Sequence, residues 1–197
     1  MQAVWEYGRP LVLGLAAAVL FAAATHAQQG AALAERILAC GACHGEDGNS
    51  KLEKIPSLAS QPEFFILNQL FLMREGVRKI EAMALFVKDL KDQDIGVLAA
   101  HFSRLPPKAS GEAIDPALVR RGEALAGPLR CASCHLPTLA GQQQMPRLAK
   151  QRIDYLIHSL MEYRDGTRSG ADTLMSNVVA GLPDADLAAL AHYSASK

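Results

Sequence analysis

Two short motifs in the sequence combine residues that can hold a covalently attached iron cofactor. Each has two cysteines three positions apart followed at once by a histidine, in Cys40-Gly41-Ala42-Cys43-His44 and in Cys131-Ala132-Ser133-Cys134-His135. Two thiols one helical turn apart can add to the two vinyl groups of a haem, while the adjacent histidine reaches the iron. The motifs therefore predict two covalently bound haem groups, with the cysteines as attachment points.

Three other uses of paired cysteines fit less well. A thioredoxin-like dithiol would lie beside a βαβ unit, and the surrounding sequence is helical. A zinc site could gather four cysteines, or two cysteines and two histidines, but would leave the identical placement of His44 and His135 unexplained. Disulfides between neighbouring cysteines are the remaining structural alternative. Only four cysteines occur in 197 residues, too few for a disulfide scaffold.

An internal repeat surrounds the two motifs. Placing Cys40 on Cys131 also aligns Pro56-Ser57-Leu58-Ala59 with Pro146-Arg147-Leu148-Ala149, and Gln61 with Gln151. Domains of about 80 residues have small cores and usually need a metal or cofactor. We expect an N-terminal domain over residues 28–104, a Pro-containing linker over 105–113 and a C-terminal domain over 114–197.

The amino end has the features of a secretory signal peptide. An uncharged apolar run over residues 11–24 follows Arg9 and precedes the small residues around Ala27. The run is shorter than the roughly 20 residues of a membrane-spanning helix, which favours cleavage near Ala27 over retention as an anchor. Residues 1–27 are thus predicted to be a signal peptide that exports the protein to the periplasm.

Local signals after this segment are helical. Asp115 can cap a helix that has Pro116 in its first turn, and Pro62-Glu63 opens another. Leu182-Pro183-Asp184 is a further helix start, with acidic groups at the positive end of the helix dipole. No convincing alternation of period two appears, so the predicted fold class is all-α.

Composition excludes several classes of protein. Half of the residues are hydrophobic, which excludes intrinsic disorder. The 20 Lys and Arg residues balance the 20 Asp and Glu residues, so no basic excess draws the chain onto nucleic acid. A loose membrane association through local patches stays open.

The whole pattern resembles the diheme cytochromes c of the cytochrome c4 family. The resemblance lies in the two haem motifs, in the segment Tyr163-Arg164-Asp165-Gly166-Thr167-Arg168 ahead of Met175, and in the helix that ends in Leu190-Ala191-His192-Tyr193. It spans roughly residues 31–194. It implies a tandem duplication of two class I cytochrome c domains, each around one haem c, that transfers electrons in the periplasm.

This resemblance implies a set of iron ligands. His44 and His135 would be the proximal ligands, with the carbonyls of Pro56 and Pro146 accepting hydrogen bonds from their rings. Each iron then needs a second axial ligand. Among the methionines beyond residue 27, only Met83 and Met175 occupy matching repeat positions, 39 and 40 residues after the histidines. Met73 and Met161 are better interpreted as core residues. Met145 adjoins Pro146 and by sequence order belongs on the wrong side of the haem. Four arginines could either reach haem propionates or lie solvated: Arg74, Arg78, Arg164 and Arg168.

Coordination by His and Met leaves no open position for a substrate, which favours electron transfer over oxygen or peroxide chemistry. The expected role is that of a carrier, not an enzyme, between a quinol-oxidising complex or a dehydrogenase and a terminal oxidase. The alternative is a haem-bearing subunit of a dehydrogenase complex, such as a sulfide-oxidising flavoprotein. Diheme peroxidases normally have longer chains and one five-coordinate haem.

Overall fold

The structure is a computed structural model that describes residues 30–31, 33–170 and 173–197. The predicted signal peptide over residues 1–27 lies outside the described residues. The chain divides into two compact units, one ending at Ala39 and one running from Cys40 to Lys197. All described residues of the first unit are helical. Within the described ranges, no helix is both long enough and apolar enough to cross a membrane.

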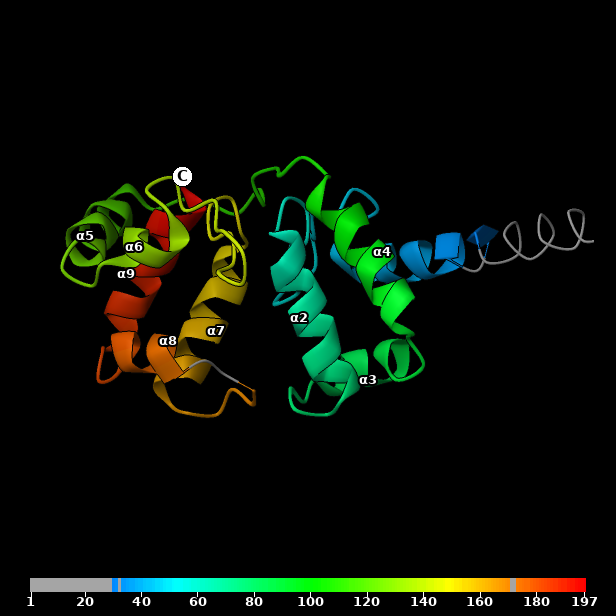
Figure 1. The fold of residues 1–197 in the computed structure, drawn as a ribbon. Helices are drawn as coiled ribbons and strands as arrows, with labels where there is room; N and C mark the ends of the chain where they lie inside the picture. The colour runs from blue at the N-terminus through cyan, green and yellow to red at the C-terminus, as the bar shows by residue number, and fades with distance from the viewer. Residues whose placement is uncertain (1–29, 32, 171–172) are drawn as a thin grey trace, which may run out of the picture. The chain divides into compact units, whose positions relative to one another are not determined.

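The second unit is built from helices joined by loops (Figure 1). Its first residues, 40–44, are the end of a helix over residues 33–44. In chain order the helices that follow are α2 (Glu63–Arg74), α3 (Glu81–Val87), α4 (Asp92–Ser103), α5 (Pro116–Ala126), α6 (Cys131–His135), α7 (Ile153–Arg164), α8 (Thr173–Val179) and α9 (Asp184–Ala195). The described part of the chain contains no strand, only an isolated bridge between Gln142 and Met145. The all-α prediction is confirmed.

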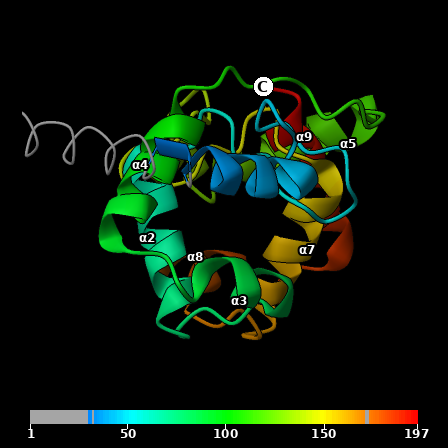
Figure 2. The ribbon, with the colours of Figure 1, turned by 90° about the vertical axis from the view of Figure 1, so that its right-hand side faces the viewer.

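The same packing pattern occurs twice within this unit. We call residues 40–104 the first half and residues 105–197 the second half. In the first half α2 packs against α4 and α3, and in the second half α7 packs against α9 and α8 (Figures 1 and 2). The buried apolar residues of α2 and α4 are Ile66, Leu70, Ile95, Leu98, Ala99 and Phe102. The buried apolar residues of α7 and α9 are Ile153, Leu156, Leu187, Ala189, Leu190, Ala191 and Ala195.

Local sequence signals explain where the helices of the second half begin. Asp115 accepts hydrogen bonds from the amides of Ala117 and Leu118, which are otherwise unpaired at the start of α5. Pro116 occupies the first position of α5, where no amide donor is needed. Asp184 and Asp186 lie in the first turn of α9. All three predicted helix starts, the one at Pro62-Glu63 included, are confirmed.

Gly122 lets α5 and α9 cross closely. A Cβ atom at this position would lie 2.1 Å from the carbonyl oxygen of Ala189 and 2.6 Å from Cβ of Tyr193. Backbone cannot yield at such distances, so any larger residue would push the two helices apart. The close crossing of α5 and α9 thus depends on a residue without a side chain.

Candidate haem sites

His44 is the last residue of the helix over residues 33–44, and its ring is buried. Its Nδ1 lies 2.8 Å from the carbonyl oxygen of Pro56. A carbonyl can only accept, so Nδ1 carries the proton and Nε2 keeps a lone pair. Burial lowers the pKa of His44, and this effect outweighs the hydrogen bond to Pro56, which raises it. The ring is therefore neutral at pH 7, which is the form that binds a metal ion.

His135 repeats this arrangement in the second half. It is the last residue of α6, is buried, and places Nδ1 2.8 Å from the carbonyl oxygen of Pro146. Burial again lowers its pKa, against the opposing effect of the hydrogen bond to Pro146. Both proline carbonyls expected from the resemblance are confirmed as acceptors. Each half thus holds one neutral imidazole in a single orientation.

The loops after the two histidines are folded so that the prolines come back to the rings. In the first half, the amides of Leu58 and Ala59 both donate to the carbonyl of Gly48. In the second half, the amides of Leu148 and Ala149 both donate to the carbonyl of Leu139. Each loop is closed just after its proline, which sets the proline carbonyl at hydrogen-bonding distance from the ring.

The cysteines lie on the helices that end in these histidines. Cys40 and Cys131 are partly buried, and Cys43 and Cys134 are exposed. Burial raises the pKa of Cys131, so its sulfur is a thiol at pH 7 and lacks the thiolate character of a reactive dithiol. The described residues also contain no group of three His, Cys, Asp or Glu side chains that could hold a metal ion such as zinc. These observations support neither the dithiol nor the zinc alternative.

Met83 and Met175 occupy equivalent places in the fold. Met83 is the third residue of α3, Met175 is the third residue of α8, and both side chains are partly buried. Met73 and Met161 lie on α2 and α7, the longer helices against which α3 and α8 pack. The structure therefore sets Met83 and Met175 apart from the other methionines as a pair, while their role as iron ligands stays a prediction.

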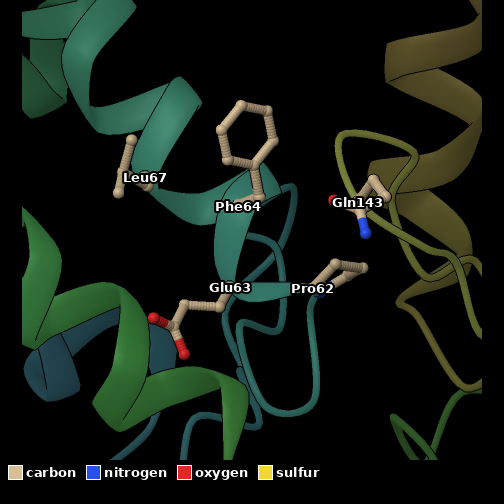
Figure 3. Close-up of a pocket in the computed structure, with 5 residues that line it drawn as sticks. All are labelled: Pro62, Glu63, Phe64, Leu67 and Gln143. Atoms are coloured by element: carbon tan, nitrogen blue, oxygen red, sulfur yellow. The ribbon is translucent and has the colours of Figure 1, made fainter.

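A surface hollow lies elsewhere, where the start of α2 faces the loop that carries Gln143 (Figure 3). It is lined by Pro62, Glu63, Phe64, Leu67 and Gln143. None of the predicted haem residues lines it, and its only ionisable side chain is Glu63. The hollow adds no candidate to the iron sites.

Known proteins resemble this chain along most of its length. Residues 119–196 match the family model for cytochrome c. Cytochrome c4 of Pseudomonas aeruginosa is 36% identical over 165 residues, which cover 78% of this chain and 81% of that protein. The chain belongs to the cytochrome c4 family. The crystal structure of reduced recombinant cytochrome c4 from Pseudomonas stutzeri matches with a TM-score of 0.75 and 34% identity, covering 83% of this chain and 95% of that one.

A third relative carries a more specific name. The thiosulfate dehydrogenase electron acceptor of Thiomonas intermedia is 30% identical over 169 residues, or 80% of this chain and 78% of that protein. With its cytochrome c4 relatives, this chain is a diheme electron-transfer cytochrome of two class I domains, and its cofactors are two haem c groups with iron. The predicted fold class and cofactors are confirmed.

Arg74 and Arg164, two of the four arginines singled out in the sequence, have protein partners that link helices together. Arg74 donates to Asp92 at 2.7 Å and to the carbonyl of Leu90 at 3.0 Å, which links the end of α2 to the start of α4. Arg164 donates to Asp184 and to the carbonyl of Leu182, which links α7 to α9 in the same way. Both guanidinium groups thus serve the scaffold.

Arg78 and Arg168 form a second matching pair. Arg78 donates to Gln69, and Arg168 donates to Glu162 at 2.9 Å and to Ser159 at 3.3 Å. Both side chains are buried. Each therefore braces the segment that leads to Met83 or Met175 against the preceding long helix.

Two glutamines that served only as repeat markers in the sequence join the halves. Gln61 donates to the carbonyl of Arg147 at 3.0 Å and accepts from its amide at 2.9 Å. Gln151 donates to the carbonyl of Ser57 at 2.9 Å and accepts from its amide at 2.8 Å. Ser57 and Arg147 directly follow the prolines that bind the two histidines. The sequence signal for this contact was the occurrence of a glutamine at the same repeat position in both halves, Gln61 and Gln151.

Proposed function

We propose that Cys40, Cys43 and His44 hold one haem c and that Cys131, Cys134 and His135 hold the other. The observation that carries this assignment is the pair of 2.8 Å hydrogen bonds from His44 to Pro56 and from His135 to Pro146. Each bond leaves Nε2 as the nitrogen with a lone pair. Each histidine also directly follows a Cys-x-x-Cys pair, which is the sequence spacing of covalent haem attachment. The donor set thus fits the cofactor in both halves.

Met83 and Met175 are the proposed sixth ligands. Their thioether sulfurs would complete the axial pairs and raise the reduction potentials. A haem with both axial positions filled supplies an iron centre that gains and loses one electron without binding a substrate. The residues of this chain hold the axial groups in place and exclude other ligands. We therefore propose a carrier and not an enzyme.

The proposed route of export and domain limits follow the sequence. Residues 1–27 would direct the chain to the periplasm, where the domains over residues 28–104 and 114–197 would each carry one haem, joined by the linker over 105–113. Cys43 and Cys134 are exposed, which leaves both thiols accessible for attachment to a haem. Mass spectrometry of the purified protein would report the mature amino terminus and two covalent haems together.

The proposed partners are redox proteins. Electrons would come from a quinol-oxidising complex or a dehydrogenase and leave to a terminal oxidase, through small transient contacts. The name of the Thiomonas intermedia relative favours a dehydrogenase as donor. The second candidate function is a haem-bearing subunit of such a dehydrogenase complex.

One set of measurements tests the ligation and separates the two functions. The purified holoprotein should show two haems c per chain by pyridine haemochrome, and its reduced form should not bind carbon monoxide at neutral pH. Rapid binding of carbon monoxide would overturn the proposed ligation. In stopped flow, a carrier should be reduced by a solubilised quinol-oxidising complex or a soluble dehydrogenase and then reoxidised by an oxidase. Stable co-elution with a dehydrogenase would favour the subunit instead.

A further inference from the structure

Arg147 is a buried cation at the contact between the two halves. The residue is only 3% exposed, although it directly follows Pro146 and so lies close in sequence to the His135 site. Burial lowers the pKa of Arg147 to about 10, which still leaves the guanidinium protonated at neutral pH. A full positive charge is therefore held away from water.

The protein supplies only neutral acceptors for this charge. Nε donates to the carbonyl of Ala59 in the first half at 3.0 Å, and Nη1 donates to the carbonyl of Ala149 in the second half. Nη2 is buried and has no hydrogen-bond partner among the residues that the structure describes. Within those residues, no carboxylate forms an ion pair with Arg147. Buried charges in proteins are normally paired with an opposite charge.

Other buried arginines of the same half show the usual arrangement. Arg152 is paired with Asp154 at 2.7 Å, and Arg168 is paired with Glu162 at 2.9 Å. Both side chains are also buried, each about 8% exposed, but each has a carboxylate partner. Among the described residues, Arg147 thus differs from Arg152 and Arg168 of its own half in having no carboxylate partner. The buried Arg78 of the first half also has none, but it donates to the side chain of Gln69.

We propose that Arg147 is the counter-ion of a haem propionate at the contact between the halves, with Nη2 as the donor. This rests on the proposed attachment of the haems at the two motifs. Each haem c brings two propionate carboxylates, which are the anions available to a cytochrome of this kind. A guanidinium binds a carboxylate through a charge-assisted hydrogen bond. This bond would give Nη2 a hydrogen-bond acceptor and would place a negative charge beside the buried guanidinium.

The two halves differ at the repeat position of Arg147, so only one of them has this arginine. The residue that matches Arg147 in the first half is Ser57, which is neutral and donates its amide to Gln151. The contact between the halves therefore has one buried cation and not a symmetric pair. A nearby positive charge disfavours the oxidised iron, which carries one more positive charge than the reduced iron. Arg147 would thus raise the potential of the haem whose propionate it binds and separate the potentials of the two haems.

The test is spectroelectrochemistry of the two-haem holoprotein with Arg147→Gln. The reduction equilibrium constant of one haem should fall about tenfold, which for one electron is about 59 mV. The unpaired buried carboxylate should then take up a proton on reduction, because burial raises the pKa of a carboxyl that has lost its cation. The potential of that haem should become pH-dependent between about pH 5 and 8, whereas in the wild type it should not change with pH.

Two further variants and one spectrum complete the test. Arg147→Lys keeps the charge and should keep the potential independent of pH. Arg164→Gln removes a partly buried arginine that is paired with Asp165 and Asp184, and should leave both potentials unchanged. Infrared difference spectra with haem labelled with ¹³C at the propionates should show a protonated carboxyl in Arg147→Gln only. Haem content by pyridine haemochrome checks the attachment separately.

The proposal is overturned if Arg147→Gln, with both haems present, keeps both potentials and their pH profiles. It is also overturned if the wild type itself shows a redox-linked protonated propionate across this pH range. If Arg147→Gln does not assemble, Arg147→Lys and the labelled wild type still decide the question.

Discussion

Gln151 of the second half holds Ser57 of the first half through both of its backbone polar groups, at 2.8 and 2.9 Å. Ser57 follows Pro56, whose carbonyl fixes the ring of His44. Gln61 does the same for Arg147, next to the proline that fixes His135. The orientation of each proposed proximal ligand is therefore braced by a side chain of the other half.

Removal of this brace should destabilise the protein. Gln151→Leu leaves the buried amide and carbonyl of Ser57 without partners, at a cost of about 1 to 3 kcal/mol for each group. Urea unfolding of the holoprotein should report a loss of about 2 kcal/mol or more. The exposed Gln144 provides the control, because Gln144→Leu should change stability by less than about 0.5 kcal/mol. Equal stability of both variants would show that the two hydrogen bonds between Gln151 and Ser57 do not contribute to the free energy of unfolding.

Haem stoichiometry should follow the cysteines. Replacement of Cys40 and Cys43 by Ala should leave one covalent haem per chain and a destabilised first half, since a small domain depends on its cofactor for stability. Cys131→Ala with Cys134→Ala should give the complementary result. Pyridine haemochrome and intact mass would count the haems. Two covalent haems in either variant would contradict the assignment.

Ligation by Met175 should be visible in potential and in ligand binding. Met175→His should keep a six-coordinate iron but lower the potential of that haem, because a thioether ligand raises it. Met175→Ala should open a site for carbon monoxide in the reduced state. Met161→Leu, on the neighbouring α7, is the control and should change neither property. An unaltered spectrum and potential in Met175→Ala would show that Met175 does not bind the iron and serves only in packing.

Glu112, in the predicted linker, should contribute to the stability of α7. Glu112 accepts hydrogen bonds from the amides of Ile153 at 2.9 Å and Asp154 at 3.1 Å, which would otherwise be unpaired at the start of that helix. Glu112→Ala should cost about 1 kcal/mol, as loss of a helix cap does. The exposed Glu123, 3.5 Å from Lys197, gives the comparison, and Glu123→Ala should cost less than about 0.5 kcal/mol. Similar losses from both would argue against the cap.

Asp154 should make stability depend on acid pH. Burial raises its pKa, but hydrogen bonds from Arg152 and from the amide of Lys54 outweigh burial, so the pKa lies below the usual 3.8. The folded state then binds fewer protons than the unfolded state, and the stabilisation is present above about pH 4 and lost as pH falls through the folded pKa.

Asp154→Asn should lose this contribution. The difference in unfolding free energy between wild type and variant, measured in urea from about pH 2 to 7, should shrink as the pH falls below about 4. Asp89→Asn, at an exposed site 4.0 Å from Lys88, should show no such trend. A difference that stays constant with pH would refute the linkage.

Much of the site could be predicted from the sequence because its chemistry is local. Two cysteines followed at once by a histidine predict haem attachment from five adjacent residues. The resemblance pointed to Pro56 and Pro146, and the repeat positions selected Met83 and Met175 as predicted ligands. Helix starts such as Asp115 are equally local, since a cap bonds amides two and three residues ahead. These features needed no knowledge of distant contacts.

The tertiary structure alone decided what the polar side chains of the repeat do. Arg74 and Arg164 had two equal interpretations, as propionate partners or solvated charges, and their partners Asp92 and Asp184 lie 18 and 20 residues away. Gln61 and Gln151 reach residues 86 and 94 positions away. Local periodicity cannot foresee such contacts, because a buried polar residue and an exposed one look alike in sequence. The physical difference is the partner across the contact, which exists only once the two halves have folded together.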